Sequence, residues 1–90
     1  MEGAGPVGLV MITSGGCPGR DRALTVLADF RSAAPEIPVT VVDIDQQPPP
    51  VDVVVVGTPM YVLRARGRHS VVSLGNPLVG ELLAAFGRHG

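Results

Sequence analysis

Short apolar runs alternate with helical stripes along the first half of the chain. Residues 7–13 form a continuous run rich in β-forming residues, which is typical of a strand buried on both faces of a parallel sheet. The apolar period then changes to that of a helix over residues 18–34, because Pro suits the first helical position and Pro35 disfavours helix before it. Cys17 is then the N-cap residue. The predicted stripe consists of Ala23, Leu24, Leu27 and Phe30. A strand over residues 39–45 completes a right-handed βαβ unit with parallel strands.

The second half predicts an antiparallel hairpin and a second helix. Residues 60–64 and 70–74 are strand-like, and Arg66-Gly67 lies midway between them to supply the turn. Asn76-Pro77 indicates a helix start, with Asn as the N-cap and Pro as the first helical residue. The apolar stripe of this helix consists of Leu78, Val79, Leu82, Leu83 and Phe86, and Gly87 ends it.

The segment between these halves gives the weakest pattern. Residues 46–57 contain three consecutive prolines and then a run of valines, so we expect extended or irregular backbone, with a single helical turn as the alternative. The element order predicts one α/β domain over residues 1–90, with residues 1–6 as a loose leader. We expect a four-stranded mixed sheet, made of a parallel βαβ half and an antiparallel hairpin, with helices on both of its faces.

Composition narrows the class of protein. A chain of 90 residues can bury one core, and its 46% hydrophobic and 17% charged residues argue against disorder. A formal net charge of −1 argues against a nucleic-acid partner, since such proteins carry a basic excess. No apolar run is long enough to span a bilayer, so we expect a cytoplasmic protein without a membrane partner. One cysteine and two widely spaced histidines predict no metal site.

Two local motifs carry a family resemblance. The first is Gly16-Cys17-Pro18-Gly19-Arg20, which follows the first strand and opens the first helix. The second is Gly57-Thr58-Pro59-Met60-Tyr61-Val62-Leu63, which leads into the hairpin. In this element order, over residues 7–86, they resemble the C-x-x-C and cis-proline segments of the thioredoxin superfamily. The resemblance implies a thioredoxin-like fold, a cis bond before Pro59, and a substrate that pairs with the backbone of Thr58.

The chain also departs from that family at several positions. Arg20 replaces the second cysteine, Gly16 stands where typical thioredoxins have Trp, and their buried acidic residue would fall at Met11. Monothiol glutaredoxins use Cys-Gly-Phe-Ser, which is absent, and their acidic pair at the last helix is replaced by Asn76-Pro77-Leu78-Val79. The fold therefore transfers better than any single activity.

Cys17 is the candidate reactive group. The helix N-terminus and the Arg20 cation favour a thiolate, and such settings lower a Cys pKa from about 8.5. With no resolving cysteine, the predicted function is monothiol disulfide exchange with protein or low-molecular-weight thiols, in which an external thiol such as glutathione completes turnover. The predicted catalytic residues are Cys17 and Arg20, and the predicted substrate-binding residues are Gly16, Pro18, Thr58 and Pro59.

Several alternatives stay open at this point. The chain is alternatively a redox-inert interaction module, in which Cys17 is a simple N-cap and Pro59 is a trans proline that opens an edge strand. A glutathione-bridged iron–sulfur dimer is disfavoured by the missing motifs. We expect a monomer, with a dimer linked through Cys17 as the alternative. The basic residues at the hairpin are expected to form a solvated tip rather than a phosphate site. They are Arg64, Arg66, Arg68 and His69.

Overall fold

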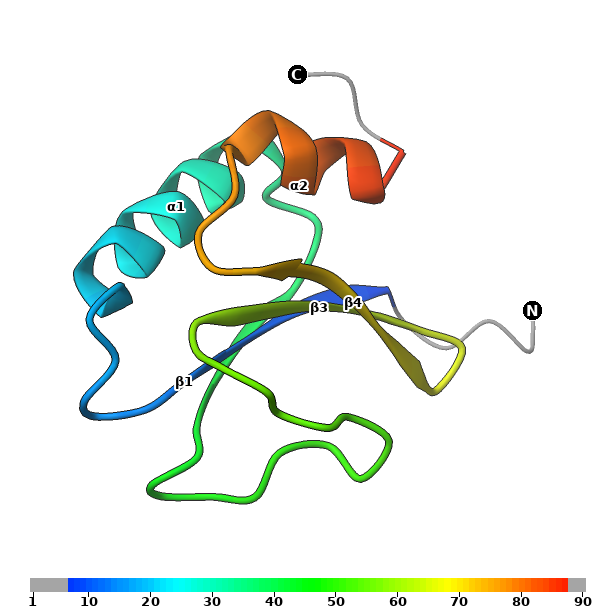
Figure 1. Ribbon diagram of the computed structural model, residues 1–90. Helices are drawn as coiled ribbons and strands as arrows, with labels where there is room; N and C mark the ends of the chain where they lie inside the picture. The colour runs from blue at the N-terminus through cyan, green and yellow to red at the C-terminus, as the bar shows by residue number, and fades with distance from the viewer. Residues whose placement is uncertain (1–6, 88–90) are drawn as a thin grey trace.

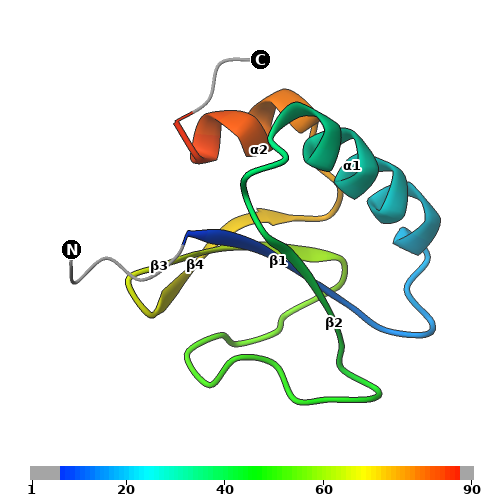
Figure 2. The same ribbon diagram turned by 180° about the vertical axis from the view of Figure 1, so that it is seen from behind.

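A computed structural model describes residues 7–87, and the predicted leader of residues 1–6 lies outside the described residues. Its elements are β1 (Gly8–Thr13), α1 (Arg20–Ala33), β2 (Val39–Asp43), β3 (Met60–Ala65), β4 (Arg68–Leu74) and α2 (Val79–Ala85). The strands form one open sheet in the order β2-β1-β3-β4 (Figures 1 and 2). This confirms the predicted element order and the α/β class.

The sheet has a parallel and an antiparallel half, as predicted. Central β1 pairs parallel with β2 and antiparallel with β3, and β3 pairs antiparallel with β4. All six residues of β1 are buried, which explains its unbroken apolar run. The β3–β4 turn holds Arg66 and Gly67 at φ values of 56° and 73°, the conformation that tight hairpin turns require.

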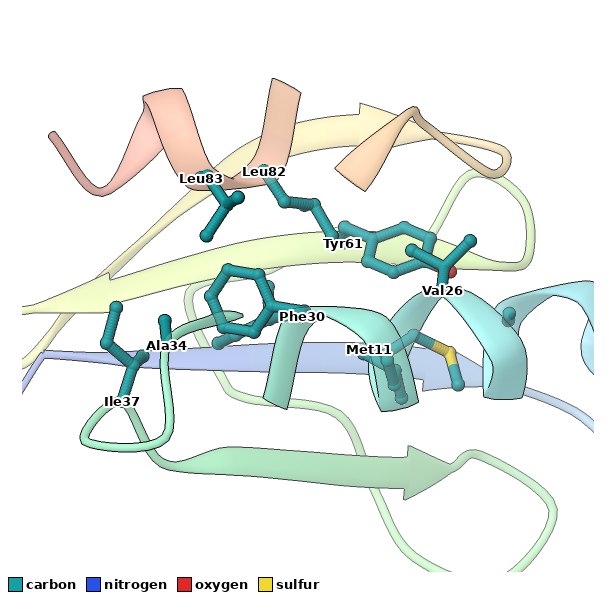
Figure 3. Close-up of a cluster of buried hydrophobic side chains, with 11 residues drawn as sticks. Met11, Val26, Phe30, Ala34, Ile37, Tyr61, Leu82 and Leu83 are labelled. Carbon is teal, nitrogen blue, oxygen red and sulfur yellow. The ribbon is translucent and has the colours of Figure 1, made fainter. Parts of the chain in front are cut away.

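Both helices cover the same face of the sheet, so the prediction of helices on both faces is wrong (Figures 1 and 2). Met11 of β1 and Tyr61 of β3 point toward this face, where they meet the buried side chains of the helices (Figure 3). Leu9 of β1 belongs to the same cluster. The helix residues in this cluster include Val26, Phe30, Leu82 and Leu83. The ring centroids of Phe30 in α1 and Phe86, which follows α2, lie 5.4 Å apart, so the two rings connect the helical segments.

The opposite face is covered by the 44–57 segment instead of a helix. This face presents Val10, Ile12, Val42, Met60 and Val62. Val53 and Val55 pack on it, whereas Val54 and Val56 are 78% and 70% exposed. The valine run therefore alternates as a strand does, without pairing in the sheet. The expectation of irregular backbone over residues 46–57 is confirmed. The prolines that precede the valines disfavour a helix in this segment.

The first helix begins later than predicted. Gly19 rather than Cys17 is the N-cap of α1, and its carbonyl oxygen accepts a hydrogen bond from the Ala23 N–H at 2.9 Å. Cys17 lies instead in two successive turns, since its N–H donates to the Ser14 carbonyl and its own carbonyl accepts from Arg20. The buried stripe also differs, because Leu24 is 47% exposed and its place is taken by Val26.

The second helix begins later as well. Its N-cap is Leu78 rather than Asn76, and the Leu78 N–H donates to the Glu81 carboxylate at 2.8 Å. Leu78 is 69% exposed, so it does not belong to the buried stripe. Gly87, at a φ of 73°, ends the helical segment as predicted. No helix within residues 7–87 is long and apolar enough to cross a bilayer.

Candidate functional site around Cys17

Cys17 lies in the loop that connects β1 to α1. The loop begins where the parallel pairing of β1 with β2 ends, and the Gly15 N–H is tied to the Asp45 carboxylate at 2.7 Å. The Cys17 N–H donates to the Ser14 carbonyl oxygen at 3.1 Å, which turns the chain back toward the sheet. As a result the Cys17 side chain is only 8% exposed, while its neighbours Gly16 and Pro18 are exposed.

The segment before β3 lies against this loop. The Thr58–Pro59 peptide bond is cis, which confirms that expectation and makes the trans alternative wrong. The hydroxyl oxygens of Thr58 and Ser14 are 3.4 Å apart. The Pro59 carbonyl accepts from the Gly75 N–H at 2.8 Å, so the segment is also joined to the connection that precedes α2. The two predicted motifs therefore lie side by side.

Gly19 permits this close approach. A Cβ atom at this position would lie 3.2 Å from Pro59 Cδ and 2.9 Å from Asn76 Nδ2. The contact with Pro59 would be tighter than most Cβ contacts, and the contact with the Asn76 amide would be closer than Cβ atoms come, so glycine suits the point where the loop packs on the proline ring. Gly16 shows the opposite situation, because nothing lies within 4 Å of the Cβ it lacks.

Competing effects act on the pKa of the Cys17 thiol. Burial acts to raise it, since a thiolate loses hydration there. Hydrogen bonds from the Thr58 side chain and the Gly19 backbone lower it, and smaller contributions come from the Thr13 side chain and the Ser14 backbone. Together these bonds outweigh burial, and the pKa of Cys17 is lowered below its ordinary value. The loop thus favours the thiolate although it shields the sulfur from solvent.

Arg20 is not among the groups that lower the pKa of Cys17. It is exposed on the first turn of α1, and the groups that lower the pKa of Cys17 are hydrogen-bonding groups of the two loops. A role for Arg20 in stabilising the thiolate stays a prediction. The structure brings together the other predicted site residues, with Gly16 and Pro18 beside Cys17 and with Thr58 and Pro59 across from it.

Tyr61 and Asn76 belong to the site and were missed by the sequence reasoning. The Tyr61 hydroxyl donates to Asn76 Oδ1 at 2.7 Å, and Asn76 Nδ2 donates to the Gly19 carbonyl oxygen at 3.0 Å. Burial first, and then the negative charge of the nearby Cys17 thiolate, raise the pKa of Tyr61 to about 12, while Arg22 acts to lower it. In the sequence, the pattern predicts that Asn76 is a helix N-cap and Tyr61 a strand residue, and neither prediction indicates a role at the site.

The backbone of Thr58 is unpaired among the described residues, and the residue is partly buried. Within residues 7–87, neither its N–H nor its carbonyl oxygen forms a backbone hydrogen bond. The adjacent Gly57 is exposed, and nothing lies within 4 Å of the Cβ that it lacks.

A separate groove lies between β4 and α2 and contains none of these site residues. Its volume is about 490 Å³. Its lining consists of Val71, Val72, Ser73, Pro77, Glu81, Ala84 and Ala85. The Glu81 carboxylate is engaged by the Leu78 N–H, and the other lining side chains bring no acid, base or nucleophile beyond one hydroxyl. The chemistry of the described residues is therefore concentrated at Cys17 rather than in this groove.

Of the basic residues at the hairpin, Arg66 and Arg68 are exposed, as expected for a solvated tip, whereas Arg64 and His69 are partly buried. The His69 ring nitrogen Nδ1 lies 2.8 Å from Asp52 Oδ1, and the His69 N–H donates to Asp52 Oδ2 at 2.9 Å. His69 therefore joins β4 to the 44–57 segment, and its backbone N–H is the main cause that lowers the pKa of Asp52.

Among residues 7–87 no group of three or more His, Cys, Asp or Glu side chains is placed to hold a metal ion.

Comparison with known proteins adds no relative to this picture. No protein-family model matches the chain, and no curated protein matches its sequence at a significant level. What the chain does is therefore inferred from the chemistry of its own residues.

Proposed function

We propose that the chain is a monothiol thioredoxin-like protein that exchanges disulfides through Cys17. The observation that carries the proposal is the packing of the Cys17 loop against the cis Thr58–Pro59 segment, where the Thr58 side chain and the Gly19 backbone act to lower the pKa of the thiol. A thiolate is the form that attacks disulfides. The order of the strands and the position of Pro59 beside the cysteine loop support the thioredoxin-like assignment.

The proposed reaction has two steps. The Cys17 thiolate attacks one sulfur of a substrate disulfide, a new S–S bond forms, and the other substrate sulfur leaves as a thiolate with the electron pair of the broken bond. The chain has no second cysteine to resolve this mixed disulfide. An external thiol such as glutathione therefore attacks it in the second step and releases the Cys17 thiolate. Substrates are disulfides or thiols of proteins or small molecules.

Thr58 provides the expected contact with a peptide substrate. Its backbone N–H and carbonyl are unpaired within the described residues, so an extended segment that carries the disulfide gains hydrogen bonds there.

We place the protein in the cytoplasm, where a lone thiol stays reduced. We propose that it acts as a monomer.

One observation favours a second candidate function. Cys17 is only 8% exposed, and a buried thiol reacts slowly unless its loop opens. In a redox-inert interaction module, the same loops would bind a partner segment at Thr58 without forming a covalent bond. Thiol chemistry separates the two candidates directly.

Trapping of a mixed disulfide tests the proposed function. The folded protein is incubated with oxidised glutathione near neutral pH, and the adduct is followed by intact mass. We expect one glutathione adduct on the wild-type protein, removed by reduced glutathione, and none on Cys17→Ser with unchanged thermal unfolding. Absence of an adduct on the folded wild-type protein would contradict the exchange proposal and leave the non-covalent module as the explanation.

A further inference from the structure

We infer that Asn76 is a positioning residue for Cys17. Asn76 holds the Gly19 backbone in place within the cysteine loop. The inference rests on the proposed function, because it concerns the same thiol. Asn76 does not touch the reacting sulfur through any hydrogen bond described above. It acts through Gly19, with which it forms a hydrogen bond across 57 residues of sequence.

The two hydrogen bonds of Asn76 fix its amide group in one orientation. The Gly19 carbonyl is an acceptor only, so the amide nitrogen Nδ2 must face it, and the 3.0 Å distance joins these atoms. The amide oxygen then faces the Tyr61 hydroxyl, which donates to it at 2.7 Å. Tyr61 is fully buried in β3. The amide is thus anchored to the core on one side and to the cysteine loop on the other.

Gly19 is the point at which this anchor reaches the thiol. Its carbonyl accepts from both Asn76 and the Ala23 N–H, and its backbone is one of the hydrogen-bond partners that lower the pKa of Cys17. The missing Cβ of Gly19 lets it pack on Pro59, which limits its movement on the other side. Loss of the Asn76 bond would free the Gly19 carbonyl and loosen the Gly19 backbone, which acts to lower the pKa of Cys17.

A purely local role for Asn76 does not account for these contacts. The sequence suggests that Asn76 caps α2, but that helix begins at Val79 and its N-cap is Leu78. The N–H of Leu78 is bonded to the Glu81 carboxylate. The hydrogen bonds of the Asn76 side chain run to Tyr61 in β3 and to Gly19 in the cysteine loop.

The test compares Asn76→Ala with Tyr61→Phe and with Ser73→Ala as a matched control. Ser73→Ala removes a nearby hydrogen bond, from the Ser73 hydroxyl to the Gly75 carbonyl, that does not reach the cysteine loop. The readout is the pH midpoint of Cys17 alkylation by iodoacetamide in the folded proteins. We expect Asn76→Ala to raise this midpoint by about 1 pH unit, the scale of one weakened hydrogen bond to a charged group. Tyr61→Phe should raise it less, and Ser73→Ala should leave it unchanged.

An unchanged midpoint in folded Asn76→Ala would overturn the inference. If Asn76→Ala does not fold, the Tyr61→Phe midpoint decides in its place, because that variant removes one hydroxyl and keeps the ring. The two proposals fail separately. A shifted midpoint without any glutathione adduct on the wild-type protein contradicts disulfide exchange alone, whereas an adduct with no shift contradicts the positioning role alone.

Discussion

At the scale of single residues, the environment of Cys17 combines burial with hydrogen bonds that favour the charged sulfur. Hydrogen bonds from the Thr58 and Thr13 side chains and from the Gly19 and Ser14 backbone together outweigh the cost of burial. The same charge acts on Tyr61, whose pKa is raised to about 12, chiefly by burial. Two ionisable groups of opposite tendency therefore share the core beside the loop, one favoured in its charged form and the other in its neutral form.

This arrangement predicts how stability changes in alkali. The folded pKa of Tyr61, about 12, lies above its unperturbed value of 10.0, so folding favours the protonated phenol. That stabilisation is complete below the unfolded pKa and is lost as the pH rises through the window between these two values. Urea unfolding from about pH 8 to about pH 11 should show a steeper loss of unfolding free energy for wild type than for Tyr61→Phe. Parallel pH profiles would contradict the assignment.

At the scale of elements, the cysteine loop, the cis-proline segment and the connection before α2 form one unit. Pro59 accepts a hydrogen bond from Gly75, Asn76 donates one to Gly19, and Gly19 packs on Pro59. The sequence places Cys17 and Pro59 near each other through the family resemblance. It does not reveal that Asn76 joins them, because an Asn-Pro pair is typical of a helix start. The partner of Asn76, Gly19, is also distant in sequence.

Substitution of Gly19 tests this unit. Gly19→Ala would put a Cβ 3.2 Å from the Pro59 ring and 2.9 Å from the Asn76 amide, so the loop must shift. We expect a loss of about 1–3 kcal/mol in the free energy of unfolding, the range for overpacking. Gly16→Ala is the matched control, since its Cβ meets nothing within 4 Å. Chemical denaturation measures both variants, and equal stabilities would show that the loop is not packed as described.

At the scale of the whole molecule, one sheet separates two apolar clusters of different construction. The helices bury Leu9 and Met11 on one face, and the 44–57 segment covers Val10 and Ile12 on the other. The sequence predicts the strands, their directions and both helices, since these depend on local period and turn residues. It does not predict the side on which α2 lies, because a helical stripe shows that a face is buried without showing which face of the sheet buries it.

The same reasoning explains the other differences. The prediction placed both helix starts too early because Cys17-Pro18 and Asn76-Pro77 look like cap and first-turn pairs. In the folded chain the Cys17 backbone groups form hydrogen bonds with Ser14 and Arg20 in turns of the same loop, and the Asn76 side chain donates to Gly19. Capping signals are local, whereas the bond of Asn76 to Gly19 depends on tertiary structure.

The most direct test of the central claim is the rate of Cys17 alkylation by iodoacetamide as a function of pH. The folded protein and the same protein unfolded in urea are measured side by side, so the unfolded chain supplies the ordinary thiol as a reference. The predicted result is a midpoint for the folded protein below that of the unfolded protein, which should lie near 8.5. A folded midpoint at or above the unfolded one would mean that burial outweighs the hydrogen bonds and would contradict Cys17 as an activated thiol.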